Sequence, residues 1–133
     1  MAAPTRRVVL LVEDNPDTAD VLRRIVSMRG YNVVAAWDGL DAMEMLRRGL
    51  RPAAIVLDLC MPNLDGRAFR TALLADPELA SIPVVVYSVD PGTDTVPQVV
   101  GHVRKGTDNP DVLMGFIEAA CARGADRPRR DGF

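Results

Sequence analysis

The sequence has few cysteines and little excess charge of either sign, and each shortage excludes a class of protein. Its two cysteines, Cys60 and Cys121, lie far apart in the 133 residues. They form neither a disulfide framework nor a zinc-ligand spacing, so we expect reduced thiols, as in cytosolic proteins. The net charge is −2, and the only local arginine cluster is at Arg127, Arg129 and Arg130. Binding to nucleic-acid phosphates needs clustered basic residues, so no nucleic-acid partner is expected.

Long apolar stretches are also missing. No segment approaches the roughly 20 apolar residues of a membrane span, so we expect no membrane association. A basic start at residues 5–7 precedes an apolar run at 8–12, but that run ends at Glu13. An export signal needs about 7–15 apolar residues without charge. We therefore interpret residues 8–12 as a buried strand and predict a cytoplasmic location.

Short apolar runs alternate with segments of helical periodicity. Continuous apolar runs of this length are typical of parallel strands covered on both faces. The candidate strands are 8–12, 33–36, 53–57, 84–86 and, more weakly, 99–103, which contains Gly101 and His102. The candidate helices are 16–29, 41–48, 67–75 and 110 to about 124. This alternation predicts βαβ units in one α/β domain, which we place at 7–123 with loose ends at 1–6 and 124–133.

Charged and polar residues follow the candidate strands. Glu13 and Asp14 follow the first, Asp58 the third, Ser88 ends the fourth and Lys105 comes after the fifth. If all the strands are parallel, these side chains converge at one edge of the sheet, where α/β proteins bind ligands. The sequence therefore predicts one site built from all five residues.

The residue types at this edge indicate phosphoryl chemistry. Three neighbouring carboxylates repel one another, so keeping them ionised needs a cation, and Mg²⁺ prefers such oxygen ligands. Lys105 adds a fixed positive charge and Ser88 a hydroxyl donor. Metal, ammonium and hydroxyl together can bind a phosphoryl group. A carboxylate can be the nucleophile and form an aspartyl phosphate.

The motifs at the strand ends carry a family resemblance. They are Leu-Val-Glu-Asp-Asn at 11–15, Ile-Val-Leu-Asp-Leu-Cys-Met-Pro at 55–62, Asp-Gly at 65–66, Val-Tyr-Ser at 86–88 and Val-Arg-Lys at 103–105. Each is weak alone, but together and in this order they are specific. The chain resembles the receiver domain of bacterial two-component response regulators, with a chemotaxis-regulator-like fold, from residue 7 to about 123.

This resemblance implies a doubly wound five-stranded parallel sheet of the flavodoxin-like type, with strand order 2-1-3-4-5. It implies that Asp58 accepts phosphate from a sensor histidine kinase or a phosphotransfer protein and signals to a downstream protein. Glu13, Asp14, Asp58 and the Cys60 carbonyl would hold Mg²⁺ or Mn²⁺, while Ser88 and Lys105 would bind phosphoryl oxygens. The protein would assist only its own phosphorylation and dephosphorylation and would not be an enzyme towards other substrates.

The sequence departs from the family pattern in three places. Gly106 follows Lys105, where the family usually has a proline joined by a cis bond. His102 stands where a tyrosine or phenylalanine usually forms a switch ring, and it is either a variant of that ring or an ordinary strand histidine. Residues 89–98 contain two prolines and a glycine and are too few for a mean helix of about 11–12 residues with its loops. We predict that the fourth helix is shortened or absent.

Other interpretations stay open at this point. Glu13 and Asp14 can simply lead into the next helix, with Asp14 or Asn15 as its N-cap. A pseudo-receiver would keep the fold and bind proteins without using phosphate. A metal-dependent phosphatase would usually have a second acid two residues after the nucleophile, where this chain has Cys60. A nucleotide or flavin binder would need a glycine-rich loop after the first strand, where this chain has two acids.

Overall fold

The computed structural model describes residues 7–59, 66–89, 99–106 and 109–126, with the backbone alone at 123–126. Strands and helices alternate as the apolar pattern predicts. The strands are β1 (Val8–Val12), β2 (Asn32–Ala36), β3 (Ala54–Leu57), β4 (Val84–Ser88) and β5 (Gly101–Arg104). The helices are α1 (Pro16–Met28), α2 (Gly39–Arg47), α3 (Gly66–Ala75) and α4 (Pro110–Asp126).

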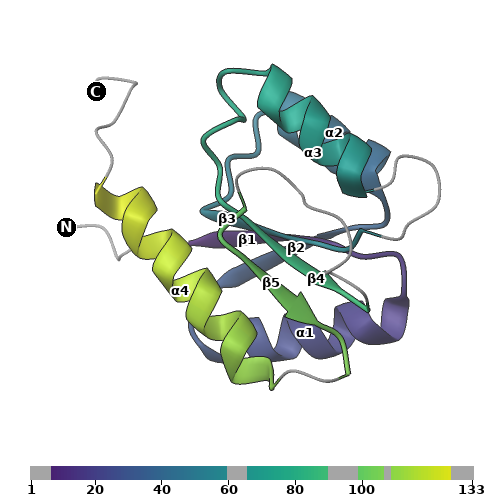
Figure 1. Ribbon diagram of the computed structural model, residues 1–133, viewed down its shortest axis with the longest axis vertical. Helices are drawn as coiled ribbons and strands as arrows, with labels where there is room; N and C mark the ends of the chain where they lie inside the picture. The colour runs from purple at the N-terminus through teal and green to yellow at the C-terminus, as the bar shows by residue number, and fades with distance from the viewer. Residues whose placement is uncertain (1–6, 60–65, 90–98, 107–108, 127–133) are drawn as a thin grey trace.

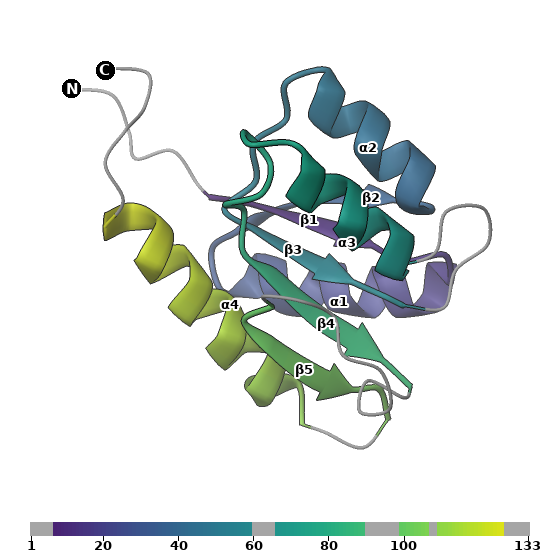
Figure 2. The same cartoon turned by 45° about the horizontal axis from the view of Figure 1, so that its top comes forward.

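The five strands form one parallel sheet in the order β2-β1-β3-β4-β5, which confirms the predicted doubly wound topology. Helices α2 and α3 cover one face of this sheet, and α1 and α4 cover the other (Figures 1 and 2). Because every strand runs in the same direction, all the carboxyl ends lie at one edge.

Each face of the sheet has its own apolar core. Successive strand side chains point to opposite faces, so Leu10 and Ile55 pack on the side of α2 and α3. Val9 and Val56 pack on the side of α1 and α4. This division explains why the central strands are apolar at every position. The edge strand β2 differs, because most of its residues are only partly buried.

The fifth strand is displaced from its predicted position at 99–103. It begins at Gly101 and extends through Arg104, and Gly101 packs closely against an aromatic ring of α4. A Cβ atom at Gly101 would lie 2.5 Å from the ring of Phe116. Two helix ends differ from the prediction by about two residues: α2 starts at Gly39, because Asp38 caps it, and α4 continues to Asp126.

The described residues contain four helices, which fits the prediction of a shortened fourth helix. Helix α4 is the helix predicted from residue 110. Of the segment 89–98, only Val89 lies within the described residues, so its expected loop conformation lies outside them and stays a prediction. The predicted domain limits and loose ends also stay predictions. Among the helices described, none has both the length and the apolar character needed to cross a membrane.

Candidate functional site

The end of β1 presents two carboxylates through a local network of backbone bonds. The Glu13 amide donates to the Ala36 carbonyl at 3.1 Å, and Glu13 Oε2 accepts from the Asn15 amide at 3.1 Å. Asn15 Oδ1 caps α1 by accepting from the amides of Asp17 at 2.9 Å and Thr18 at 3.0 Å. Of the two N-cap candidates in the sequence, Asp14 and Asn15, it is therefore Asn15 that caps α1. The side chain of Asp14 is not used for capping.

Asp58 follows β3 in a tightly packed position. Its amide donates to the Val12 carbonyl at 3.0 Å, and only 5% of the residue is exposed. The first residue of helix α3, Gly66, packs directly against the backbone of Asp58. A Cβ atom at Gly66 would lie only 2.5 Å from the Asp58 carbonyl oxygen. The glycine at 66 therefore allows the close approach that buries Asp58. The Asp-Gly motif at 65–66 was visible in the sequence, but this steric requirement was not.

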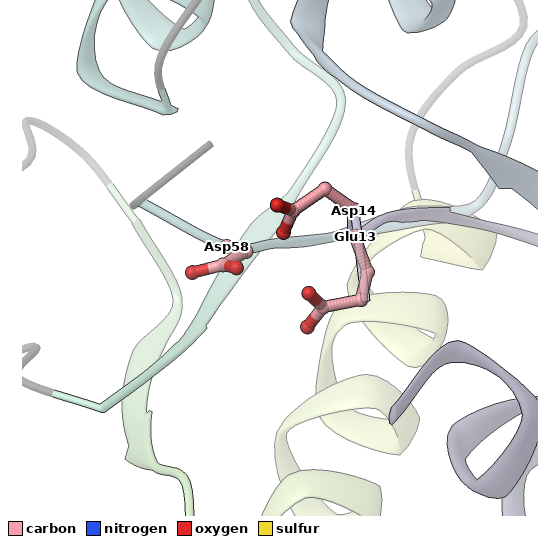
Figure 3. Close-up of side chains that lie close together, drawn as sticks. All are labelled: Glu13, Asp14 and Asp58. Carbon is pink, nitrogen blue, oxygen red and sulfur yellow. The ribbon is translucent and has the colours of Figure 1, made fainter. Parts of the chain in front are cut away.

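The carboxylates of Glu13, Asp14 and Asp58 come together at this edge, with oxygens that lie within 4.8 Å of one another (Figure 3). Glu13 is only 2% exposed, and this burial raises its pKa to about 7 from an ordinary 4.5. The nearby charge of Asp58 acts in the same direction, while hydrogen bonds from Lys105 and Asn15 oppose the shift. A cation between these oxygens would relieve the cost, so the donor set fits a hard divalent ion.

Lys105 provides the positive charge of the site. Its Nζ lies 2.5 Å from Glu13 Oε1 and 3.1 Å from Asp58 Oδ2, and its side chain is 16% exposed. The Lys105 amide donates to the Ser88 carbonyl at 2.9 Å, which extends the pairing of β4 and β5. Burial lowers the pKa of Lys105, but its hydrogen bond with Glu13 and the charge of Asp58 outweigh this and raise it overall. The lysine is therefore a stable cation here.

Ser88 ends β4 and is fully buried. Its Oγ has no hydrogen-bond partner within the part of the chain that the structure describes. Leu57 is in register with Val86, so Ser88 lies one residue beyond the position opposite Asp58. An unpaired buried hydroxyl costs about 1–3 kcal/mol, so Ser88 gains from any oxygen that comes within reach and accepts a hydrogen bond from it.

The predicted residues are not all found together. Asn15, Thr18 and Val89 join the three acids and Lys105 around an open pocket of about 320 Å³, and nothing in the sequence singled out Thr18 or Val89 for it. His102 is exposed on β5, paired in register with Val86, and does not line this pocket. Cys60 lies outside the described residues, so its predicted carbonyl ligand stays a prediction.

Comparison with known proteins agrees with this geometry. A family model described as the response regulator receiver domain matches residues 9–107. The chain belongs to the response regulator receiver domain family. This receiver domain has both the sheet order and the acidic edge that the sequence predicted.

A curated relative, the response regulator MprA of Mycobacterium leprae, is 48% identical over 58 residues. That match covers 44% of this receiver domain and 25% of the relative, so the chain matches only a quarter of the length of such relatives. Among solved structures, the signal receiver domain of a histidine kinase from Syntrophus aciditrophicus is 26% identical with a TM-score of 0.79. The match covers 93% of this chain and 96% of that one.

Two further structures concern ligands and modification. The Mn²⁺-bound form of response regulator Rcp1 is 26% identical with a TM-score of 0.68, over 90% of this chain and 93% of that one. The phosphorylated cyanobacterial phytochrome response regulator RcpA is 27% identical with a TM-score of 0.70, over 90% and 91%. These solved receivers are similar in fold to this chain along most of its length.

Proposed function

We propose that this receiver domain accepts a phosphoryl group on Asp58 from a phosphohistidine of a sensor kinase or a phosphotransfer protein. The observation that carries the proposal is the position of Asp58, buried beside two acids with the Lys105 ammonium 3.1 Å from Oδ2. A carboxylate in that position can be both nucleophile and metal ligand. The phosphorylated structure of the similar RcpA supports the same chemistry.

The proposed step is a transfer between two groups. An oxygen of the Asp58 carboxylate forms a bond to phosphorus as the bond from phosphorus to the histidine nitrogen breaks. The nitrogen keeps the electron pair, and the product is an acyl phosphate on Asp58. To end the signal, water attacks the phosphorus, the bond from phosphorus to the Asp58 oxygen breaks, and inorganic phosphate leaves with the carboxylate regenerated. In this proposal the domain acts only on its own aspartyl phosphate.

The side chains of Glu13, Asp14 and Asp58 would hold Mg²⁺ or Mn²⁺, together with the Cys60 carbonyl as predicted from the family. When bound, such an ion neutralises charge that develops on the phosphoryl oxygens. The oxygen donors fit it, and the Mn²⁺-bound structure of the similar Rcp1 supports this choice of metal.

Lys105 and Ser88 would recognise the phosphoryl group. Lys105 would offer its ammonium to one phosphoryl oxygen, and the buried Ser88 hydroxyl would donate to another. The resulting rearrangement around β4 and β5 would be read by a downstream protein. The kinase, that downstream protein and a cytoplasmic location belong to the proposal.

Intact mass spectrometry after incubation with acetyl phosphate and Mg²⁺ tests it. The wild type should gain the mass of one phosphoryl group, and Asp58→Asn should gain none while keeping its thermal stability. Asp20→Asn, which changes an exposed acid on α1, serves as the matched control and should be labelled like the wild type. An unlabelled wild type, under conditions that label another receiver in parallel, would favour the pseudo-receiver instead.

A further inference from the structure

Lys105 must cross a strand to reach its partners. It follows β5, whereas Asp58 follows β3, and β4 lies between these strands in the sheet. Adjacent strands lie about 4.8 Å apart, so about 10 Å separates the backbones of β5 and β3. The lysine side chain therefore has to stay extended over the end of β4.

An aromatic ring lies where the lysine crosses. Lys105 Nζ is 5.8 Å from the centroid of the Tyr87 ring, within the roughly 6 Å over which a cation and a ring face attract each other. Tyr87 is the residue before Ser88, and its side chain is half-buried against the core on the side of α1 and α4. The core thus fixes one side of the ring and leaves the other available to the ammonium.

The backbone after Lys105 offers little restraint of its own. Gly106 has a φ of 75°, and a Cβ atom placed there would meet nothing within 4 Å. The structure describes no cis peptide bond in its residues, so the bond between Lys105 and Gly106 is trans. Within the described residues, Lys105 contacts the Ser88 carbonyl through its amide, the Glu13 and Asp58 carboxylates through its ammonium, and the Tyr87 ring.

These contacts respond differently to a metal ion. Glu13 and Asp58 are also the candidate metal ligands, so an ion would compete with Lys105 for their charge. The ring carries no charge and binds no hard cation through oxygen, so it would hold the ammonium in either case. A flexible lysine side chain loses rotamer freedom when it is held in one position, so a contact that persists with and without the ion helps to keep it there.

We propose that Tyr87 is a positioning residue for Lys105: the face of its ring holds the ammonium over the end of β4, ready for the phosphoryl group. This rests on the proposed function, since it assigns Lys105 to the phosphoryl oxygens. The ring thus helps to restrain the Lys105 side chain, which the backbone at Gly106 does little to hold.

The test compares Tyr87→Phe, which keeps the ring face, with Tyr87→Leu, which removes it. Protons on the carbon next to Nζ of Lys105 should show an upfield ring-current shift by NMR in the wild type and in Tyr87→Phe. Tyr87→Leu should lose that shift. It should also react about three- to tenfold more slowly with acetyl phosphate and Mg²⁺, while Tyr87→Phe keeps the wild-type rate.

The outcomes separate this inference from the proposed function. A ring-current shift that survives in Tyr87→Leu, or an unchanged rate in that variant, overturns the positioning role. A shift that depends on the ring, in a protein that no phosphodonor labels, supports the contact and defeats the proposed function. Tyr87→Met, which fills a similar volume, replaces Tyr87→Leu if thermal melting shows that the leucine variant is unfolded.

Discussion

The acidic half and the basic half of the site differ in how firmly the surrounding structure holds their side chains. The acidic half, Glu13, Asp14 and Asp58, is fixed by the Asn15 cap, by backbone bonds and by packing against Gly66. In the basic half, Ser88 belongs to β4, but Lys105, which is followed by Gly106, depends on one backbone bond and on side-chain contacts that cross β4. The difference teaches that Asp58, the proposed phosphoacceptor, is preorganised by the fold, whereas the position of the lysine depends on a few individual contacts.

The strongest way to break the acidic half is Gly66→Ala. The added Cβ would meet the Asp58 carbonyl at 2.5 Å and the Leu59 Cα at 2.6 Å, both of them backbone atoms that cannot rotate away. We expect a loss of about 3 kcal/mol in the free energy of unfolding, together with slower phosphorylation of Asp58. Urea denaturation and intact mass measure the two effects.

Gly115→Ala is the matched control for this change. Gly115 lies in α4, and a Cβ atom there would meet nothing within 4 Å. Alanine in place of an unstrained helical glycine should raise stability by about 0.5–1 kcal/mol. Equal effects of the two substitutions would show that the approach of α3 to Asp58 is not restrictive.

The buried Glu13 makes the stability of the metal-free domain depend on pH. Its pKa is about 7 in the folded chain, against 4.5 as the ordinary value, so the folded state binds the proton more tightly. The stabilisation is complete below about pH 4.5 and is lost as the pH rises to about 7, by about 1–3 kcal/mol. Denaturation in EDTA from about pH 5 to about pH 7.5 should show this fall in stability.

Glu13→Gln should flatten that dependence, because the amide does not titrate. Glu44→Gln removes an exposed glutamate on α2 and should leave the slope as in the wild type. A slope that persists unchanged in Glu13→Gln assigns the proton uptake to another group.

Much of this fold could be predicted from the sequence because its signals are local. The apolar runs mark β1, β3 and β4, Gly30 ends α1 with a φ of 94°, and Asn15 caps it. The fifth strand was placed two residues too early because Val99 and Val100 continue its apolar run, and the close approach of Phe116 to Gly101 is a tertiary contact that no local pattern reports. The acidic half could be predicted for the same reason, because its three acids directly follow apolar runs.

The basic half was less predictable, because it depends on contacts between residues that are distant in the sequence. Strand ends located Ser88 and Lys105, but the Tyr87 ring beneath the lysine is a contact between neighbouring strands. An aromatic residue in the otherwise aliphatic β4 was the available signal. From the family pattern alone, His102 was either a variant of the switch ring or an ordinary strand histidine, and its exposure on β5 leaves a role as a switch untested.

A divalent metal ion should increase the difference between the two halves of the site, because it would stabilise the acidic half. An ion that binds only the folded state adds about 1.4 kcal/mol at tenfold its dissociation constant, so Mg²⁺ should raise the melting temperature. Asp14→Ala should remove most of this rise, because it deletes one of the three clustered carboxylates. Asp20→Ala, on the exposed side of α1, should retain it. If the rise survives Asp14→Ala, the ion binds elsewhere.

A small loss of stability is expected from Gly106→Ala, in the basic half. Gly106 has a φ of 75°, a conformation that costs other residues about 1 kcal/mol, but no neighbour obstructs a Cβ atom there. Gly49→Ala is the matched control, because Gly49 also has a positive φ of 111° and open space around it. Both variants should lose about 1 kcal/mol by urea denaturation. Only Gly106→Ala should also change the rate of phosphorylation. Lys105 is the preceding residue, so a shift of the backbone at Gly106 would move its side chain. Identical rates in the two variants would mean that the carboxylates and the Tyr87 ring hold the lysine regardless of the backbone after it.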